Sequence, residues 1–289
     1  MDEVIQVESY PDRDSKMSID SWRRSVGGLT AMALVTAARQ GATCRLVSVL
    51  GVDELSRYLE TALATEGIDL TLISRQQEAG PVHSAVVVGS DNSRTLLFDR
   101  RAVTPPETPL PNDAVLGARV LVIDHTAGPT GVAAARTARS AGIPVVADFE
   151  EAHFADFDQL LKLTDHLVLG ERFAAELTGR ATPQESAAAL WREDMGAVVI
   201  TAGEQGAWFA SAGSDEVRHC PAFSVTAVDT TGCGDVFHGA YAACLASGSA
   251  VAEAVEVAAA AAALKATGSG LDAIPRGHEV ERFIRERSS

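Results

Sequence analysis

The hydrophobic positions of the chain alternate between short apolar runs and stretches with the spacing of an amphipathic helix. Residues 28–42 have helical spacing and precede the apolar run 44–50, and the helical stretch 54–67 precedes the run 69–74. Further along, the pattern predicts strands at 119–124, 143–149, 166–170 and 197–203, and helices at 129–141, 157–163, 171–178 and 183–194. Near-continuous apolar strands separated by helices predict a parallel sheet with helices on both faces, so the expected fold class is α/β.

Two regions depart from this alternation. Residues 82–102 contain two β-rich runs around the turn GSDNS, and residues 1–25 contain two strand-like runs around the turn PDRDS. Both patterns are typical of hairpins rather than of strand–helix–strand units. We expect one small antiparallel sheet, a lid made of residues 1–25 and 82–102, which projects from an α/β core of residues 26–81 and 103–289.

Composition and charge narrow the class of protein. The 289 residues are 46% hydrophobic and 22% charged, as in ordinary globular proteins, and the net charge is −15. Such an acidic chain is not expected to bind nucleic acid through the phosphate backbone, although a local basic pocket for a small anion is compatible with it. The most apolar run, AVEVAAAAAALKA, is interrupted by Glu256 and Lys265, which predicts a packed helix rather than a membrane span.

The cysteines favour a reducing, cytoplasmic compartment. No two of them have CxxC spacing, and no secretory leader pattern is present, so we expect neither disulfides nor export. A zinc site is not expected either, because the candidate ligands match no common spacing. The four cysteines are Cys44, Cys220, Cys233 and Cys244, and the zinc candidates are His219, Cys220, Cys233 and His238.

The segment AVDTTGCGDVFHGA, residues 227–240, carries the clearest chemistry. Gly232 and Gly234 allow a tight bend whose backbone N–H groups point into one concavity, at the positive end of the helix that follows. Such a bend favours an anion, and Asp235 beside it would repel that anion unless the carboxylate has a task of its own. Asp235 could remove a proton from a hydroxyl nucleophile while the amides stabilise a transferred phosphoryl group. The alternative is that Asp235 only complements the helix dipole and the glycines only form a turn.

A second glycine-rich bend lies in VVITAGEQGAWFAS, residues 198–211. Thr201, Gly203 and Gly206 follow a predicted buried strand, and the glycines permit close approach of the backbone to a nucleotide phosphate. The alternative is a simple hairpin turn. Ligands of open α/β sheets bind beyond the carboxyl ends of the strands, which is where both bends are expected.

The segment DTTGCGDVFHGAYAACLASG resembles the second signature of the PfkB/ribokinase family of carbohydrate kinases, D-T-T-G-A-G-D-x-F-x-G. Four further segments are similar to the family in the same order along nearly the whole chain. They are VGGLTAMALVTAARQGA, VLGVDELSRYLETALATEGID, ITAGEQGAW and ALKATGSGLDAIP. The resemblance implies a ribokinase-like fold with a β lid and an ATP-dependent phosphotransferase that acts on a sugar hydroxyl.

The resemblance also implies roles for residues. Asp235 would be the base, and the amides of Gly232, Cys233 and Gly234 would form the anion hole. Asp229 would organise the loop, in some relatives near a monovalent cation such as K⁺, and Mg²⁺ would accompany ATP. The remaining implied contacts are Thr201, Gly203, Gly206, Asp229 and Thr231 for ATP, and Asp2, Gly27 and Gly28 for the sugar.

Three departures from the family pattern qualify these expectations. Relatives place a hydrophobic strand and a glycine before the aspartate that matches Asp2, so we expect the natural chain to begin upstream, since a missing strand leaves unpaired sheet edges. The family's N-x-x-E falls on Gly170 to Phe173 and is absent. Sugar-binding asparagines of some relatives fall on Leu29 and Met32, whose apolar side chains argue against a ribose-like set of contacts.

The sulfofructose kinase and ketohexokinase branches look most similar, so we expect transfer to a primary hydroxyl of a ketose or a sulfosugar. Lys16 in the lid would meet an anionic group at the far end of the sugar, whereas Phe98 and Thr126 replace expected sulfonate contacts. The lid suggests a homodimer, and the helix N-terminus suggests a lowered pKa for the Cys233 thiol. Two alternatives are a nucleoside kinase of the same fold and a non-catalytic sensor of sugar or nucleotide.

Overall fold

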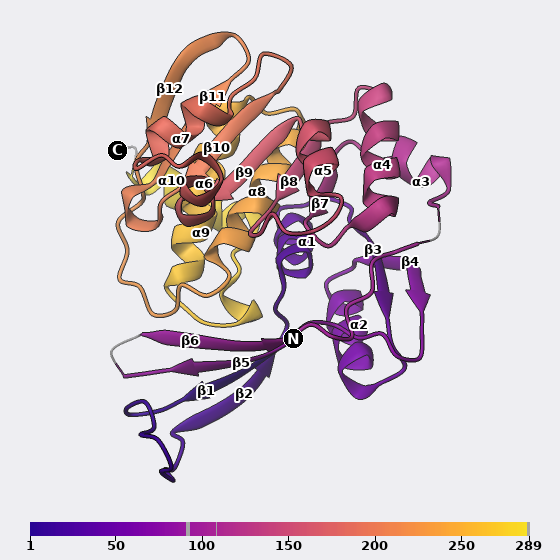
Figure 1. Cartoon of the computed structure of the whole chain (residues 1–289). Helices are drawn as coiled ribbons and strands as arrows, with labels where there is room; N and C mark the ends of the chain where they lie inside the picture. Colours follow the sequence, from indigo (N-terminus) through magenta and orange to yellow (C-terminus); the bar gives the residue numbers. More distant parts are fainter. Residues whose placement is uncertain (91–92, 108, 288–289) are drawn as a thin grey trace.

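A six-stranded sheet forms the centre of the main body in the computed structural model, which describes residues 1–90, 93–107 and 109–287 (Figure 1). Strands β7 to β10 are parallel, and β11 and β12 extend the sheet in antiparallel fashion beyond β10. The spatial order is β12-β11-β10-β9-β8-β7, which confirms the predicted parallel-rich α/β core. The bounds are β7 Leu121–Asp124, β8 Val145–Asp148, β9 His166–Gly170, β10 Ala197–Thr201, β11 Ala207–Ser211 and β12 Ser214–Cys220.

Helices cover both faces of this sheet, and neighbouring strand residues alternate between two hydrophobic clusters. Val146 and Val168 pack with α1, α8 and α9, whereas Val145 and Leu167 pack with α4 to α7, as the two-residue period of a strand requires. The first layer comprises α1 Leu29–Arg39, α8 Cys233–Ser247, α9 Val251–Ala266 and α10 Gly277–Arg287. The second comprises α3 Asn112–Leu116, α4 Gly128–Ser140, α5 Phe157–Leu163, α6 Glu171–Thr178 and α7 Pro183–Leu190.

The predicted helix 183–194 is too long at its carboxyl end. It begins as expected, with Thr182 and Glu185 forming a reciprocal capping box, but α7 stops at Leu190. Trp191, which follows it, has extended backbone angles (φ −64°, ψ 135°) and starts the connection to β10. Sequence pattern locates a helix better than it locates the last residue of that helix.

Two further strands stand apart from the central sheet. β3 (Arg45–Leu50) and β4 (Asp69–Arg75) pair in parallel and are joined through α2 (Glu54–Thr65). Within residues 1–90, 93–107 and 109–287, no strand joins β3 to β7, the last strand of the central sheet. The two edges therefore lack strand partners among these residues.

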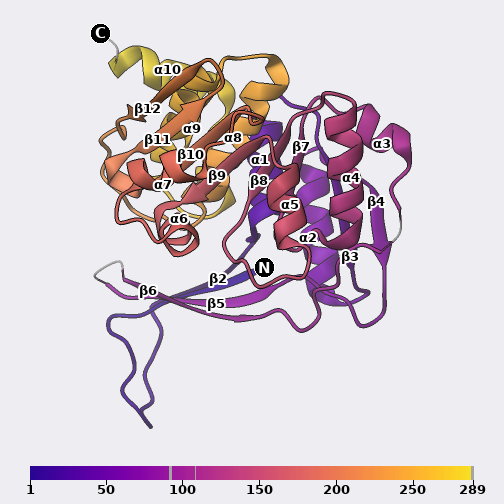
Figure 2. The ribbon, with the colours of Figure 1, turned by 45° about the horizontal axis from the view of Figure 1, so that its top comes forward.

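The lid is a separate four-stranded sheet that lies beneath the main body (Figures 1 and 2). Its order is β2-β1-β5-β6, built from β1 (Asp2–Gln6), β2 (Ser21–Ser25), β5 (His83–Val88) and β6 (Arg94–Asp99). Both predicted hairpins are present, although residues 91–92 of the turn GSDNS lie outside the described residues. The sheet is mixed rather than wholly antiparallel, because the hairpins join through their first strands, β1 and β5, which run in the same direction.

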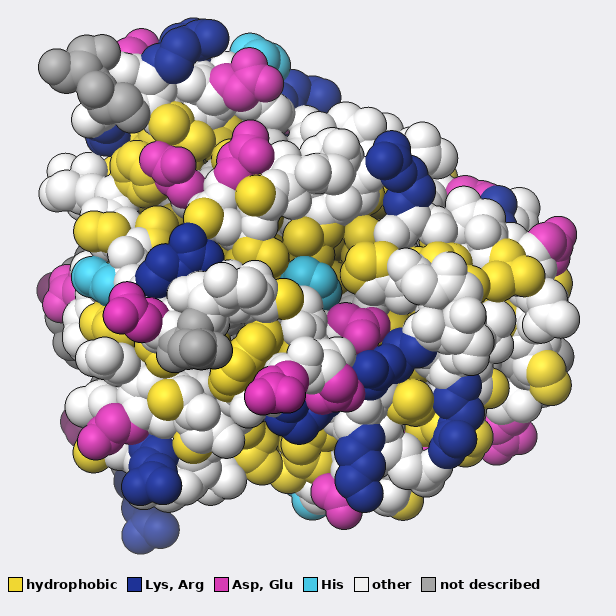
Figure 3. Space-filling view, turned by 90° about the horizontal axis from the view of Figure 1, so that it is seen from above, with side chains coloured by type: hydrophobic (Ala, Val, Ile, Leu, Met, Phe, Trp, Pro, Cys, Tyr) yellow, Lys and Arg dark blue, Asp and Glu magenta, His cyan; other side chains and the backbone are white. Residues whose placement is uncertain are grey.

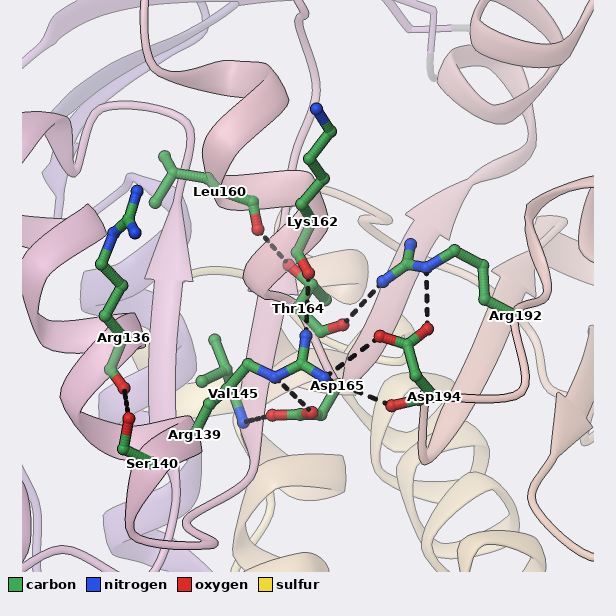
Figure 4. Close-up of polar contacts among 10 residues, drawn as sticks. All are labelled: Arg136, Arg139, Ser140, Val145, Leu160, Lys162, Thr164, Asp165, Arg192 and Asp194. Atoms are coloured by element: carbon green, nitrogen blue, oxygen red, sulfur yellow. Dashed lines mark hydrogen bonds and ion pairs between the residues drawn. The ribbon is translucent and has the colours of Figure 1, made fainter.

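A polar cluster fastens the amino-terminal ends of the central strands (Figure 4). Arg139, in the last turn of α4, lies 3.3 Å from Asp165 and 3.1 Å from Asp194 and donates to the backbone carbonyl of Lys162. Asp165 also accepts a hydrogen bond from the amide of Val145 at the start of β8. Burial raises the pKa of Asp165, which the backbone amide and Arg139 partly offset. These contacts hold one end of the sheet, whereas the candidate residues lie at the other.

The surface carries charges of both signs. On the face shown in Figure 3, acidic and basic side chains are interspersed, with no continuous basic stripe. No helix in the described part of the chain is both long and apolar enough to cross a membrane.

Candidate active site

Asp235 lies in the first turn of α8, directly behind the predicted glycine bend. Gly232 has a left-handed backbone (φ 77°), and its carbonyl accepts the helical hydrogen bond from Val236 at 2.9 Å. A side chain at Gly232 would be strained by this φ and would also approach the buried Met32 side chain within 3.0 Å. The loop that precedes α8 is therefore shaped by the glycine, as the sequence indicated.

The amides of this bend are not equivalent. The Cys233 amide donates to the Thr230 carbonyl at 3.3 Å and so closes the turn instead of facing a ligand, contrary to the role expected for it. Among the described residues, the amides of Gly232 and Gly234 have no backbone acceptor of this kind. Two of the three predicted donors therefore have no backbone acceptor, and their role as anion donors stays a prediction.

The Asp235 carboxyl has a pKa raised well above its usual range. Burial is the main cause, and the carboxylates of Asp148 and Glu150 raise the pKa further, with a smaller effect from Asp2 of the lid. The His238 ring acts in the opposite direction. A carboxylate with a raised pKa accepts a proton more readily than an ordinary aspartate, which suits a general base.

His238 is a buried member of the site that the sequence analysis did not identify. Its Nδ1 lies 2.8 Å from the Gly234 carbonyl and 3.4 Å from Oδ2 of Asp148, and its Nε2 lies 2.9 Å from the Val168 carbonyl. These contacts hold the ring between α8 and β9, beside the buried carboxyl group of Asp148.

Two strand-end aspartates were also missed. Asp124 ends β7 and accepts hydrogen bonds from Thr30 at 2.5 Å and from the Thr126 hydroxyl at 2.6 Å. Asp148 ends the neighbouring strand β8, in register with Asp124. A usable signal was present, since both acids close predicted parallel strands, and such ends meet at one edge of the sheet.

Two arginines of the lid reach the loop before α8. Arg94 donates to the Thr230 hydroxyl at 2.9 Å and to the Thr231 hydroxyl at 3.3 Å. Arg23 lies 3.4 Å from Oδ2 of Asp229, whose other oxygen accepts a hydrogen bond from the Thr231 amide at 2.9 Å. The lid and the loop are therefore in direct polar contact, and Asp229 and Thr231 lie at that contact.

The predicted sugar contacts divide into two groups. A Cβ on Gly27 would lie 2.0 Å from Oδ2 of Asp2, so only glycine leaves room for this carboxylate. Gly28 (φ 100°) then starts α1. Lys16, by contrast, is exposed on the β1–β2 connection, which points away from the core in Figure 2, and it is not brought to the other candidates.

The second glycine bend forms the hairpin between β10 and β11. Thr201 ends β10, and its hydroxyl donates to the Leu169 carbonyl at 3.4 Å. Gly203 and Gly206 both have positive φ, and a Cβ on Gly206 would lie 2.1 Å from the Cys220 carbonyl. Hairpin packing thus accounts for Gly206, and nucleotide contacts by Thr201, Gly203 and Gly206 stay predictions.

The expected activation of Cys233 is wrong. Burial raises the pKa of its thiol to about 11, and the lowering effects of Lys265 and Arg94 are smaller. At neutral pH the residue is therefore a thiol, not a thiolate.

At the position of the family's N-x-x-E, Phe173 is buried in the core and Gly170 has no side chain. In the part of the chain that the structure describes, no cluster of three His, Cys, Asp or Glu side chains could hold a metal ion.

Comparisons with known proteins agree with this arrangement. A model of the pfkB family of carbohydrate kinases matches residues 1–276. The ribokinase of Haemophilus influenzae is 29% identical over 293 residues, covering 98% of this chain and 95% of that protein. A candidate ribokinase of Agrobacterium tumefaciens has a TM-score of 0.93 at 24% identity, covering 99% and 95% of the two chains. Arabidopsis thaliana ribokinase, solved with ribose and ATP, has a TM-score of 0.83 at 22% identity, covering 98% and 95%.

Proposed function

The chain belongs to the pfkB family of carbohydrate kinases, and we propose that it transfers the γ-phosphoryl group of ATP to a primary hydroxyl of a sugar, with Asp235 as the general base. The observation that carries this proposal is the position of Asp235. A carboxylate with a raised pKa lies one residue after Gly234, at the amino terminus of α8, where the bend favours an anion.

The proposed step is an in-line displacement at phosphorus. The sugar hydroxyl gives its proton to the Asp235 carboxylate, and its oxygen forms a bond to the γ-phosphorus. The bond from the γ-phosphorus to the β–γ bridging oxygen breaks, and ADP keeps that electron pair. The amides of Gly232 and Gly234 would donate to the phosphoryl oxygens, where negative charge accumulates in the transition state.

The nucleotide would lie along the edge of the sheet where β10 and the loop before α8 end. Thr201, Gly203, Gly206, Asp229 and Thr231 are its proposed contacts, and Arg94 of the lid already donates to the loop hydroxyls. Mg²⁺ would arrive with the ATP phosphates, and its charge would neutralise theirs.

Two observations point to different sugars. The similar proteins favour ribose, since they are ribokinases and one of them was solved with ribose and ATP. The structure supplies Asp2 as a polar contact, but Met32 is buried and apolar and Leu29 cannot donate a hydrogen bond. We therefore propose ribose as the first acceptor to test and a ketose or sulfosugar as the second, although the exposed position of Lys16 gives the sulfosugar no support.

The test is ADP release from Mg-ATP across ribose, ketoses, other aldoses, sulfosugars and nucleosides. Turnover with one sugar class and with no nucleoside is the expected result. Turnover with nucleosides would replace the proposal by a nucleoside kinase. ATP binding in calorimetry without turnover of any compound would favour the non-catalytic sensor.

The lid and the cysteines support two smaller proposals. Strand β6 is an edge strand and is exposed along its whole length, and a second copy covering this apolar surface would form a homodimer. On the face of the lid opposite Arg23 and Arg94, the exposed apolar side chains of this surface are Trp22 and Leu97. All four cysteines are free, which supports a reducing compartment such as the cytoplasm.

A further inference from the structure

Lys265 is fully buried at the end of α9, which is unusual for a lysine. Its ammonium group lies 3.4 Å from the Asp229 carbonyl and 3.4 Å from the Gly268 carbonyl. The Asp229 amide also donates to the Ala266 carbonyl of the same helix at 3.1 Å. The first residue of the DTTGCGD loop is therefore fixed to the carboxyl end of α9 by its backbone and by a lysine.

Two positively charged side chains already lie beside Asp229. Its carboxylate faces Arg23 of the lid at 3.4 Å, and the Lys265 ammonium lies against its carbonyl. The helix end contributes partial negative charge from its free carbonyl groups, which favours a cation at this place. Burial lowers the pKa of Lys265, and the Asp229 carboxylate, the largest opposing influence, favours its charged form.

The family resemblance implied a monovalent cation near Asp229, and the residues present do not fit one. A metal cation would have to share the Asp229 carbonyl with an ammonium group that cannot leave, because its side chain is enclosed. Two full positive charges at a few ångströms in a buried site repel each other strongly. The cationic position beside the loop is thus taken by the protein's own side chain.

We infer that the Lys265 ammonium replaces the monovalent cation and holds the DTTGCGD loop in its working shape, so that the enzyme needs no K⁺ or Na⁺. Lys265 is a positioning residue, since it acts through the backbone of Asp229 and touches no reacting atom. This inference rests on the proposed kinase activity, but one of its readouts, thermal stability, is independent of turnover.

The test exchanges KCl for NaCl or choline chloride at constant ionic strength, for the native chain and for Lys265→Met. The native kcat/KM is expected to change less than twofold between the salts. Lys265→Met removes the ammonium group and shortens the side chain by one atom, which opens a space beside the Asp229 carbonyl. In choline chloride, the kcat of this variant is expected to be at least tenfold below that of the native chain, and KCl is expected to restore it at least fivefold. Its melting temperature is expected to rise in KCl but not in choline chloride.

Lys162→Met is the matched control, because Lys162 is an exposed lysine on α5. It is expected to behave as the native chain in every salt. Activation of the native chain several-fold by K⁺ would overturn the inference, as would a folded Lys265→Met that is fully active in choline. If Lys265→Met does not fold, Lys265→Arg tests the inference instead, because it keeps the positive charge. This variant is expected to fold and to be active in choline chloride. Dependence of its activity on K⁺ would overturn the inference. Absence of turnover in the native chain would count against the proposed function, whereas the effect of KCl on the melting temperature of Lys265→Met would still decide about Lys265.

Discussion

At the scale of single residues, the proposed base Asp235 lies among charges of both signs. Asp235 has carboxylates nearby that make it harder to ionise and a histidine that makes it easier. Burial, Asp148 and Glu150 raise the pKa of Asp235 and His238 lowers it, and together they set the pH at which the proposed base becomes ionised.

The first prediction concerns the pH profile of kcat/KM, whose acid limb reports ionisation of the base in the free enzyme. As the proposed base, Asp235 acts when deprotonated, so activity is expected to fall as the pH falls through its pKa. Glu150→Gln removes a carboxylate that raises this pKa, so the acid limb should move to lower pH. His238→Gln removes a group that lowers the pKa, so the limb should move to higher pH. Shifts in the same direction, or none, would contradict the described surroundings of Asp235.

Cys233 gives a second prediction at this scale. Because burial raises the pKa of its thiol to about 11, alkylation by iodoacetamide at pH 7 should be slower than for a free cysteine in solution and should speed up as the pH approaches 11. Peptide mass spectrometry of time points at pH 7 and pH 9 measures this. Rapid labelling at pH 7 would indicate a thiolate and would restore the expectation drawn from the helix N-terminus.

The sequence revealed these residues unequally. Gly232, Gly234 and Asp235 were found because the bend and the base are adjacent in one motif. Asp148 and His238 were not, because their meeting depends on how β8 and α8 pack, and Lys265 was noticed only as a break in an apolar run. The Cys233 expectation failed because the helix dipole is visible in sequence, whereas burial of the thiol is not.

At the scale of elements, the site depends on close packing of α1 against α8. Gly239 makes this possible, because a Cβ there would lie 2.2 Å from the Ala33 carbonyl and 2.7 Å from the Thr36 Cβ. Helix α1 also brings Met32 against Gly232 and Thr30 against Asp124, so its position affects both sides of the site.

Gly239→Ala should therefore destabilise the fold by about 1–3 kcal/mol, because backbone atoms cannot move aside as a flexible side chain can. Thermal melts followed by circular dichroism measure the loss. Gly170→Ala is the control, since an added Cβ there meets no heavy atom within 4 Å and the backbone φ is −70°. Equal melting temperatures for Gly239→Ala and the control would contradict the close packing of the two helices.

The elements themselves were largely predictable, since the apolar alternation gave the order of strands and helices. The carboxyl end of α7 and the direction of pairing in the lid were not. Leu190 and Trp191 are both compatible with a helix, and the parallel pairing of β1 with β5 joins segments about eighty residues apart, about which local pattern gives no information.

At the scale of the whole molecule, the lid has two surfaces with different tasks. One face carries Arg23 and Arg94 to the loop before α8, and the opposite face carries the exposed side chains of Trp22 and Leu97, which remain for a partner. If that partner is a second copy, light scattering should give twice the 30.2 kDa of the chain. Leu97→Asp, at a side chain that is 62% exposed, should shift the equilibrium to the monomer without loss of fold. A native chain that is monomeric at tens of micromolar would rule out this dimer.

The central claim is that Asp235 removes the proton from the sugar hydroxyl. The most direct measurement is kcat for ADP release by the native chain, Asp235→Asn and Asp158→Asn, with the acceptor that the sugar panel identifies and with ATP affinity measured in parallel. Asp158 is an exposed acid in the first turn of α5, so its variant tests the alternative that an acid there only complements a helix dipole. The account predicts a loss of about 10²–10⁴-fold in kcat for Asp235→Asn with ATP still bound, and native kcat for Asp158→Asn. Comparable kcat values for the native chain and Asp235→Asn would contradict it.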